Sequence, residues 1–400
     1  MNTKKATAIQ KSVFYPALMS SMSSVVFGMS LTVMGCMHSL VLEMWKRTMD
    51  ETTANSRWGI ASGNIFLGCL VSNILVNVLR PNLKKALLFS NILYAMGYIT
   101  FLLSQSFSFS FMLSGRLIVG LAAGVTCAIV PIYISLISPT EYRGFLLSFH
   151  PLGINIGVTF GNALSCLSSD NTWRIPLFTA LILVALNFLG LLGIDSPGHE
   201  EGSSGASLPD LITNNRARKS IFLAILVHMS QHLCGVDYIT LFLKDLFPSD
   251  IHSSEVMAIW ISLFSVLVTV VFTKYIDLIG RKPLIIASSL ITGTATAMLT
   301  FDLYPPVATM LFVFGYNIGL SSIPWFITTE VFPPKYANSA GLLAVSMNWL
   351  SAYGILVILY PLHVRYGNIM FSFYTACMGL FVGLMAFLFR ETKNKTPDFQ

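Results

Sequence analysis

The sequence carries very little charge. Of its 400 residues, 10% are Asp, Glu, Lys or Arg, whereas 54% are apolar, and the mean hydropathy is +0.71. Soluble domains carry about a quarter of their residues as charges, because a surface that faces water needs them. A surface that faces lipid excludes them, at a cost of roughly 3 kcal/mol or more for each charge. The composition therefore excludes an ordinary soluble domain and indicates an integral membrane protein.

Several functional signatures are also missing. The net charge of +6 includes no basic run interleaved with aromatics, so we expect no nucleic-acid partner. The six cysteines form no Cys-x-x-Cys pair and lie in or beside apolar stretches, which favours packing over disulfides or metal binding. No Walker sequence, Ser-His-Asp signature or paired acid and nucleophile is visible. The sequence predicts no enzyme activity, no cofactor and no metal.

Long apolar stretches dominate what is present. A helix needs about 20 residues to cross roughly 30 Å of hydrocarbon. We predict an all-α membrane protein of twelve spans, with six in an N-terminal half, 1–194, and six in a C-terminal half, 219–389. A linker, 195–218, separates the halves, and a tail, 390–400, follows them. The spans are expected near 12–36, 58–79, 86–105, 109–137, 144–167, 175–194, 219–246, 256–276, 283–303, 306–329, 339–362 and 368–389.

The basic residues set the expected orientation. If the N-terminus is inside, seven of the 24 fall in outer segments, namely Lys46, Arg47, Arg57, Arg116, Arg174, Lys244 and Arg365. The other 17 fall in inner segments, so the positive-inside rule places both termini in the cytoplasm. The first apolar stretch is too long for a signal peptide, and we expect it to remain as the first helix.

The two halves repeat each other after their fourth spans, where segment 135–143 resembles segment 329–337. Two related six-helix halves predict alternating access around one central site. Small residues also recur at every fourth position, namely Gly153, Gly157 and Gly161. This spacing predicts a close approach to a neighbouring helix.

Motifs along nearly the whole chain resemble the sugar porter family of the major facilitator superfamily. They are Gly115-Arg116 through Pro131-Ile132-Tyr133-Ile134-Ser135 with Pro139 and Arg143-Gly144; Gln231-His232-Leu233-Cys234-Gly235; Asp277-Leu278-Ile279-Gly280-Arg281-Lys282; Ile323-Pro324-Trp325-Phe326 with Glu330 and Phe332; Asn348-Trp349; and Glu391-Thr392-Lys393. Their order and spacing together are specific. The resemblance implies a major facilitator fold and sugar as the substrate.

The resemblance implies a substrate site formed by Gln231, His232, Asp237, Asn348, Trp325 and Asn317. Amides suit a sugar because each bonds two hydroxyls, and an indole ring covers the apolar face of a sugar. Without the resemblance, mid-span amides also fit hydrogen bonds between helices. His232 and Asp237 stand where the family has Gln and Asn, and Pro151 stands where it has a sugar-binding Gln. The expected pocket is therefore polar but altered.

A second set is implied for gating and a cytoplasmic latch: Arg143, Glu330, Asp277, Gly280, Arg281, Lys282 and Arg116. The family's acidic and arginine partners at the inner ends are here replaced by Leu136 and Ala337. We therefore predict a weakened latch and a population shifted toward the inward-open state.

Coupling to protons needs a buried acid that binds and releases a proton. Proton-coupled members of the family have Asp in the first helix, where this chain has Ser30. We predict facilitated diffusion of a hexose, with Asp237 as the one substitute proton carrier. Transport of a polyol, pentose or nucleoside, proton-coupled sugar transport, and a non-transporting sensor stay open as alternatives. We expect the protein to lie in the lipid bilayer of the plasma membrane and to function as a monomer.

Overall fold

A computed structural model describes residues 3–103, 108–139, 142–165, 168, 172–197, 206–241, 243–247, 251–272 and 275–400. Within these ranges the chain is helical and contains no strand. It divides into two compact units. Unit 1 contains Met1–Thr48 and Asn64–Glu200, and unit 2 contains Met49–Gly63 and Glu201–Gln400.

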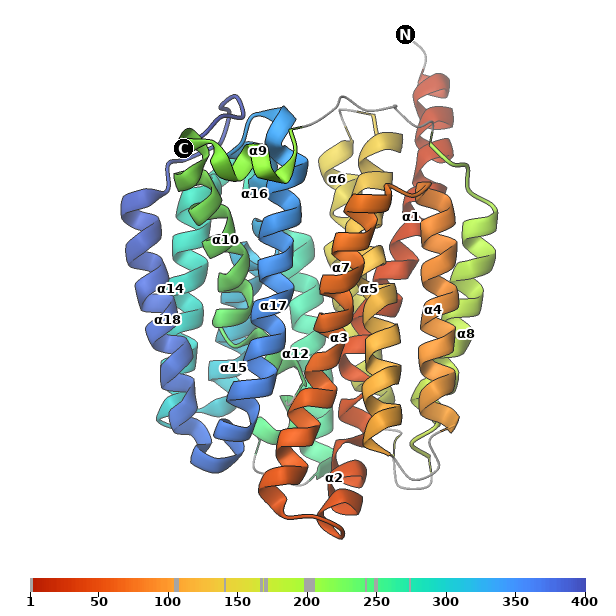
Figure 1. Cartoon of the computed structure of the whole chain (residues 1–400), viewed down its shortest axis with the longest axis vertical. Helices are drawn as coiled ribbons and strands as arrows, with labels where there is room; N and C mark the ends of the chain where they lie inside the picture. The colour runs from red at the N-terminus through yellow and green to blue at the C-terminus, as the bar shows by residue number, and fades with distance from the viewer. Residues whose placement is uncertain are drawn as a thin grey trace. The chain divides into compact units, whose positions relative to one another are not determined.

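The first part of the chain, to residue 192, forms eight α-helices and one short 3₁₀ helix. Their bounds are α1 Thr3–Thr32, η1 Gly35–Met37, α2 His38–Lys46, α3 Glu51–Leu79, α4 Leu83–Leu103, α5 Phe109–Ile137, α6 Arg143–Leu147, α7 Phe149–Ser165 and α8 Ile175–Leu192. Within unit 1, α1 packs against α5, α7 and α8, and α4 packs against α5 and α8 (Figure 1).

The second part, from residue 208, is more broken. Its bounds are α9 Leu208–Thr213, η2 Asn215–Ala217, α10 Arg218–Leu233, α11 Val236–Leu241, η3 Leu243–Leu246, α12 Ile251–Phe272, α13 Ile276–Ile279, α14 Arg281–Thr300, α15 Pro305–Gly315, η4 Tyr316–Leu320, α16 Pro324–Glu330, α17 Pro334–Tyr366, η5 Gly367–Met370 and α18 Phe371–Leu388. In unit 2, α14 packs against α15 and α18, and α10 packs along α17.

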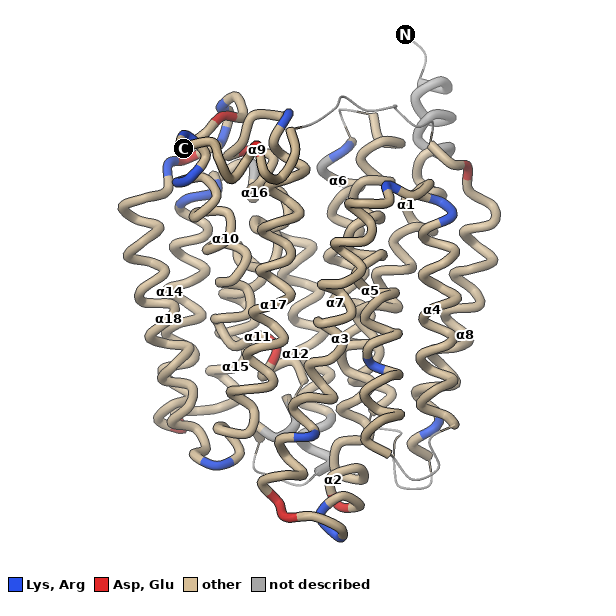
Figure 2. Tube along the Cα trace, viewed as in Figure 1, with Lys and Arg blue, Asp and Glu red and all other residues tan. Residues whose placement is uncertain are grey.

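Nine segments of the described residues are long and apolar enough to cross a membrane, and Val256–Phe272 is a shorter apolar helix. One of the nine, Pro334–Leu388, contains both α17 and α18. Charged residues gather near helix ends, and α8 and α18 carry none (Figure 2). The chain is thus a multi-pass membrane protein, while the count of twelve spans remains a prediction.

Several predicted spans are interrupted for identifiable reasons. The predicted span 144–167 is divided at Ser148 into α6 and α7. Pro151 lies in the first turn of α7, where its missing N–H would have no partner within the helix. The predicted span 219–246 is broken at Gly235, whose φ of 97° is a conformation that favours glycine. Between α15 and α16, η4 is a π-helix.

Small residues set the helix spacing in unit 1, as their pattern predicted. A Cβ added to Gly157 would lie 2.1 Å from the carbonyl oxygen of Val25 in α1, and one added to Gly161 would lie 2.0 Å from Thr32 Oγ1. The backbones of α1 and α7 are therefore so close at Gly157 that only glycine fits there, and at Gly161 an added Cβ would meet the Thr32 side chain. This confirms the structural role predicted for the glycines of α7.

Candidate functional site

Two buried amides form the centre of a polar network in unit 2. Gln231 on α10 donates from Nε2 to the carbonyl oxygens of Leu320, at 2.9 Å, and Ser321, at 3.2 Å. Asn348 on α17 donates from Nδ2 to Gln231 Oε1 and to the carbonyl oxygen of His228, both at 2.8 Å. The structure thus joins the two amides directly and links them to the last residue of the π-helix and to the residue after it.

His232 and Asp237 extend this network. Asp237 Oδ2 lies 2.7 Å from His232 Nδ1, and His232 Nε2 lies 3.1 Å from Asn348 Oδ1. Both side chains are less than 10% exposed. Because an unpaired charge is costly away from water, the carboxylate and imidazole stabilise each other there. Four of the six predicted substrate-site residues therefore form one continuous chain of hydrogen bonds.

The other two predicted substrate-site residues lie differently. Trp325 on α16 is half-buried, with its ring centroid 6.4 Å from His228 and 6.0 Å from Trp349, beside the network. Asn317 lies in η4 and bonds to Thr269, Ser265 and the carbonyl oxygen of Val313, at 2.8 to 3.0 Å. Asn317 therefore links the π-helix to α12.

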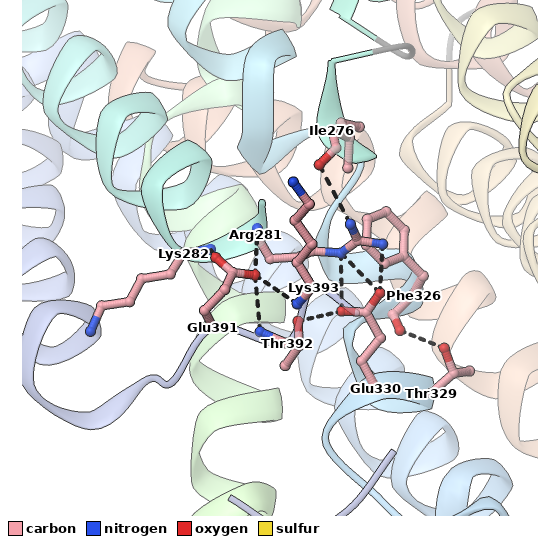
Figure 3. Close-up of polar contacts among 9 residues, drawn as sticks. All are labelled: Ile276, Arg281, Lys282, Phe326, Thr329, Glu330, Glu391, Thr392 and Lys393. Atoms are coloured by element: carbon pink, nitrogen blue, oxygen red, sulfur yellow. Dashed lines mark hydrogen bonds and ion pairs between the residues drawn. The ribbon is translucent and has the colours of Figure 1, made fainter. Parts of the chain in front are cut away.

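Three predicted latch residues of unit 2 lie at the start of α14, namely Gly280, Arg281 and Lys282. Arg281 binds Glu330 at the end of α16, with Nη2 to Oε1 at 2.8 Å and Nε to Oε1 at 2.9 Å (Figure 3). The Arg281 guanidinium also lies 5.4 Å from the centroid of the Phe326 ring. Lys282 Nζ donates to the carbonyl oxygen of Ala386 in α18. These contacts tie α14 to α16 and α18 within unit 2.

Glu391 caps α14 from the tail. Its carboxylate accepts from the backbone N–H groups of Arg281, Lys282, Thr392 and Lys393 at 2.8 to 2.9 Å (Figure 3). Partial burial raises the pKa of Glu391, but these four donors outweigh that effect, so the pKa stays below its usual value. Gly280, with φ of 106°, leaves room for the carboxylate, because an added Cβ would lie 2.7 Å from Glu391 Oε2.

The remaining latch residues lie elsewhere. Arg143 is exposed at the start of α6 and has no hydrogen bond or ion pair with any other residue that the structure describes. The side chain of Asp277 lies outside the described residues. Arg116 is fully buried about two turns into α5, far from the end that precedes Arg143, and its Nη1 donates to the carbonyl oxygen of Ser30 at 2.6 Å. A latch role for Arg116 remains a prediction.

Sequence reasoning did not identify five of the contributing groups, three of which are backbone carbonyl oxygens. The carbonyl oxygens of Leu320, Ser321 and His228 carry no signal in the sequence, because every residue has a carbonyl group. The capping role of Glu391 was also missed, although the residue belongs to a recognised motif. Thr392, in the same motif, donates to Glu330 at 2.5 Å.

In the described residues, long apolar helices enclose a buried polar network, which is the organisation of a multi-pass membrane protein. The family model "Sugar (and other) transporter" matches residues 16–199 and 193–398. The chain belongs to this family, which confirms the resemblance to sugar porters of the major facilitator superfamily.

Relatives from several kingdoms are similar to the chain. A probable metabolite transport protein of Saccharomyces cerevisiae is 25% identical over 350 residues, covering 74% of this chain and 72% of the relative. The facilitated glucose transporter member 1 of Gallus gallus is 23% identical, covering 89% and 84%. The facilitated glucose transporter member 9 of Homo sapiens is 25% identical, covering 94% and 82%.

Solved structures share the fold. A crystal structure of a D-xylose–proton symporter superposes with a TM-score of 0.82 and 17% identity, covering 96% of this chain and all of that one. The inward-open xylose transporter of E. coli gives a TM-score of 0.80 at 17% identity, covering 96% and 98%. The chain therefore has the major facilitator fold.

Proposed function

We propose that the chain carries a hexose-like sugar across the membrane by alternating access. Membership of the sugar transporter family supports the reaction class. The observation that carries the substrate proposal is the bonded pair Gln231 and Asn348, buried among apolar helices at the motif positions that the family uses for sugar. Polar groups buried in a membrane protein typically mark a transport pathway, because their burial is costly.

We further propose twelve spans in two six-helix halves, with both termini in the cytoplasm and the monomer as the functional unit in the plasma membrane. The gathering of basic residues in the segments assigned to the inside supports the orientation. Residues Arg143, Asp277, Gly280, Arg281, Lys282 and Glu330, with Arg116, are proposed to act in gating.

Facilitated diffusion is the mode that we favour. Where proton-coupled relatives have an acid, Ser30 bonds through its hydroxyl to Tyr98 Oη at 2.6 Å and to the carbonyl oxygen of Val26 at 2.7 Å. This position thus contains no group that titrates near neutral pH. Uptake that stops when a pH gradient is collapsed would contradict the passive mode.

Uptake of labelled hexose into proteoliposomes tests the proposal. We expect saturable uptake that Gln231→Ala reduces at least about tenfold, because the substitution removes a buried amide with three hydrogen bonds. Ser114→Ala, which changes an exposed serine on α5, is the control. Absence of uptake in the unmodified protein would favour the sensor alternative.

A second candidate is a polar solute other than hexose. It is supported by His232 and Asp237, which place an ionisable pair where the family has neutral amides. Competition by unlabelled polyols, pentoses and nucleosides against labelled hexose separates the two candidates. If one of these solutes competes better than hexose, it is the substrate.

A further inference from the structure

The hydrogen bonds around Gln231 have a direction that can be determined from its neighbours. The carbonyl oxygens of Leu320 and Ser321 only accept, so the amide nitrogen of Gln231 must face them. Its oxygen then faces Asn348 and accepts. The orientation of the Gln231 amide is thus fixed by the backbone at the end of η4.

The same reasoning fixes Asn348. Its nitrogen lies 2.8 Å from Gln231 Oε1 and 2.8 Å from the carbonyl oxygen of His228, and both of these atoms accept. Nδ2 therefore donates both of its protons, and Oδ1 faces His232 Nε2 at 3.1 Å. An amide oxygen cannot donate, so His232 Nε2 must carry a proton.

The opposite ring nitrogen meets a second acceptor. His232 Nδ1 lies 2.7 Å from Asp237 Oδ2, and an ionised carboxylate only accepts. A neutral imidazole carries one proton, which the contact with Asn348 already requires on Nε2. A proton on Nδ1 as well makes the ring an imidazolium, and the adjacent carboxylate neutralises it.

We propose that His232 is held as an imidazolium by Asp237, and that loss of its second proton reorients Asn348 and Gln231 and so weakens sugar binding. This proposal rests on the proposed function, because it assigns a proton to the same substrate site. Without the proton, one ring nitrogen turns a lone pair toward Asn348 Oδ1 or toward Asp237. If Asn348 rotates to relieve this, its oxygen meets the oxygens of Gln231 and His228.

Sugar affinity should therefore fall as the pH rises. The protonated network holds both amides in one orientation, and such preorganisation favours binding. Once the proton is lost, a lone pair of the ring faces either Asn348 Oδ1 or Asp237 Oδ2, so no arrangement of the network satisfies every partner. If the proton stays on His232 throughout the transport cycle, no net proton crosses the membrane with the sugar. Transport then remains passive.

The titratable groups that face the pair are His228 on α10, Cys234 at the end of α10, Tyr316 on η4 and Tyr374 on α18. From α17 and α16 the neighbours are uncharged, namely Asn348, Trp349 and Trp325. His228 Nδ1 lies 2.9 Å from the carbonyl oxygen of Ala224, so that nitrogen donates. Tyr and Cys are neutral near pH 7, so these three side chains add no charge beside the His232 ring.

Equilibrium exchange of labelled hexose in proteoliposomes, with the same pH on both sides, tests the effect on binding. Histidines titrate in the range between about pH 5.5 and 8.5. Over this range we expect the apparent KM to rise about tenfold, which is the change in affinity that corresponds to the free energy of one charged hydrogen bond. His232→Gln should flatten this dependence, because its amide donates to Asn348 without titrating. Asp237→Asn should also flatten it, and it serves as the second variant if the first fails to fold.

The control variant is His363→Gln, which changes another buried histidine, one that packs against Tyr238 and Phe371. Its dependence of KM on pH should match that of the unmodified protein. A KM that does not change with pH, or that falls as pH rises, would overturn the proposal. The same slope in His232→Gln as in the unmodified protein would also overturn it.

A second measurement needs no substrate. In ¹⁵N-histidine-labelled protein in lipid, NMR should show one histidine with both ring nitrogens protonated at neutral pH, and His232→Gln should remove that signal. If the protein exchanges no hexose at any pH, the proposed function is wrong, and the spectrum alone decides whether His232 is an imidazolium. A spectrum in which His232 has one protonated nitrogen would refute the imidazolium, whether or not hexose is carried.

Discussion

At the scale of single residues, hydrogen-bond capacity decides how buried polar groups are used. Gln231 and Asn348 each use both protons of the amide nitrogen and at least one lone pair of the oxygen within the protein. A sugar hydroxyl must therefore replace a protein partner or use a second lone pair. The same groups thus serve as contacts between helices and as candidate sugar ligands, two interpretations that the sequence alone had left open.

Asn348→Ala should reduce both stability and transport. The change leaves Gln231 Oε1 and the carbonyl oxygen of His228 without their shared donor, at a cost of about 1 to 3 kcal/mol. We expect a lower unfolding temperature and at least about tenfold slower hexose uptake. Asn368→Ala, which changes an exposed asparagine of η5, is the matched control. Uptake at the unmodified rate in Asn348→Ala would argue against Asn348 as a sugar ligand.

At the scale of elements, helices are kept in place by close backbone contacts and by caps. In unit 1 the glycines of α7 allow α1 to approach to backbone contact. In unit 2 the start of α14 has no acidic residue of its own in its first turn, and Glu391 supplies the acceptor from a distant part of the chain. A carboxylate at a helix N-terminus stabilises it both by hydrogen bonding and by its charge.

Gly157→Ala should separate α1 from α7. The new Cβ would lie 2.1 Å from the carbonyl oxygen of Val25, a backbone atom that cannot move away alone. We expect a loss of about 1 to 3 kcal/mol, measured as a lower unfolding temperature in detergent. The control is Gly383→Ala on α18, where nothing lies within 4 Å of the added Cβ. Equal stability of the two variants would show that the close contact of α1 and α7 is not required.

Glu391→Gln should weaken the start of α14 by about 1 kcal/mol, because a neutral amide caps a helix less well than a carboxylate. The lowered pKa of Glu391 means that its contribution is present above the usual value of 4.5 and is lost as the pH falls below it. The unfolding temperature of the unmodified protein should therefore drop in acid more than that of Glu391→Gln. Glu43→Gln, which changes an exposed residue of α2, should retain the full acid response. Identical acid profiles for Glu391→Gln and the unmodified protein would contradict this role.

At the scale of the whole molecule, alternating access depends on how the two ends of the carrier open and close. The latch predicted from the family resemblance lacks two charged members here, because Leu136 and Ala337 stand at their positions. The surviving pair, Arg281 and Glu330, joins α14 to α16 within unit 2. We therefore expect the inward-open state to be more populated than in relatives with the full set.

Cysteine accessibility tests this expectation. In a cysteine-free background, Leu136→Cys and Thr329→Cys should react with a membrane-impermeant thiol reagent applied to the cytoplasmic side without substrate. Restoring the family residues with Leu136→Glu and Ala337→Arg should slow labelling of Thr329→Cys severalfold, because an added ion pair stabilises the closed inner end. Tight protection of both positions before the restoration would show that the latch is not weakened.

Composition, hydropathy and motifs were enough to identify the class of protein and the segments that carry its polar site residues. Low charge and long apolar stretches identified a membrane protein, and ordered motifs identified the family. The predicted span 109–137 coincides with α5. These features could be predicted because hydropathy and helix length depend on residues that are adjacent in the chain.

The hydrogen-bond partners of the site residues became evident only from the packed helices. It joined Gln231 to the carbonyl oxygen of Leu320 and brought Glu391 to the first residue of α14. It also fixed the order of donors from Gln231 through Asn348 to His232, on which the inferred proton depends. The physical reason is that a hydrogen bond requires a position and a direction in space, and residues far apart in the sequence acquire these only when the helices pack.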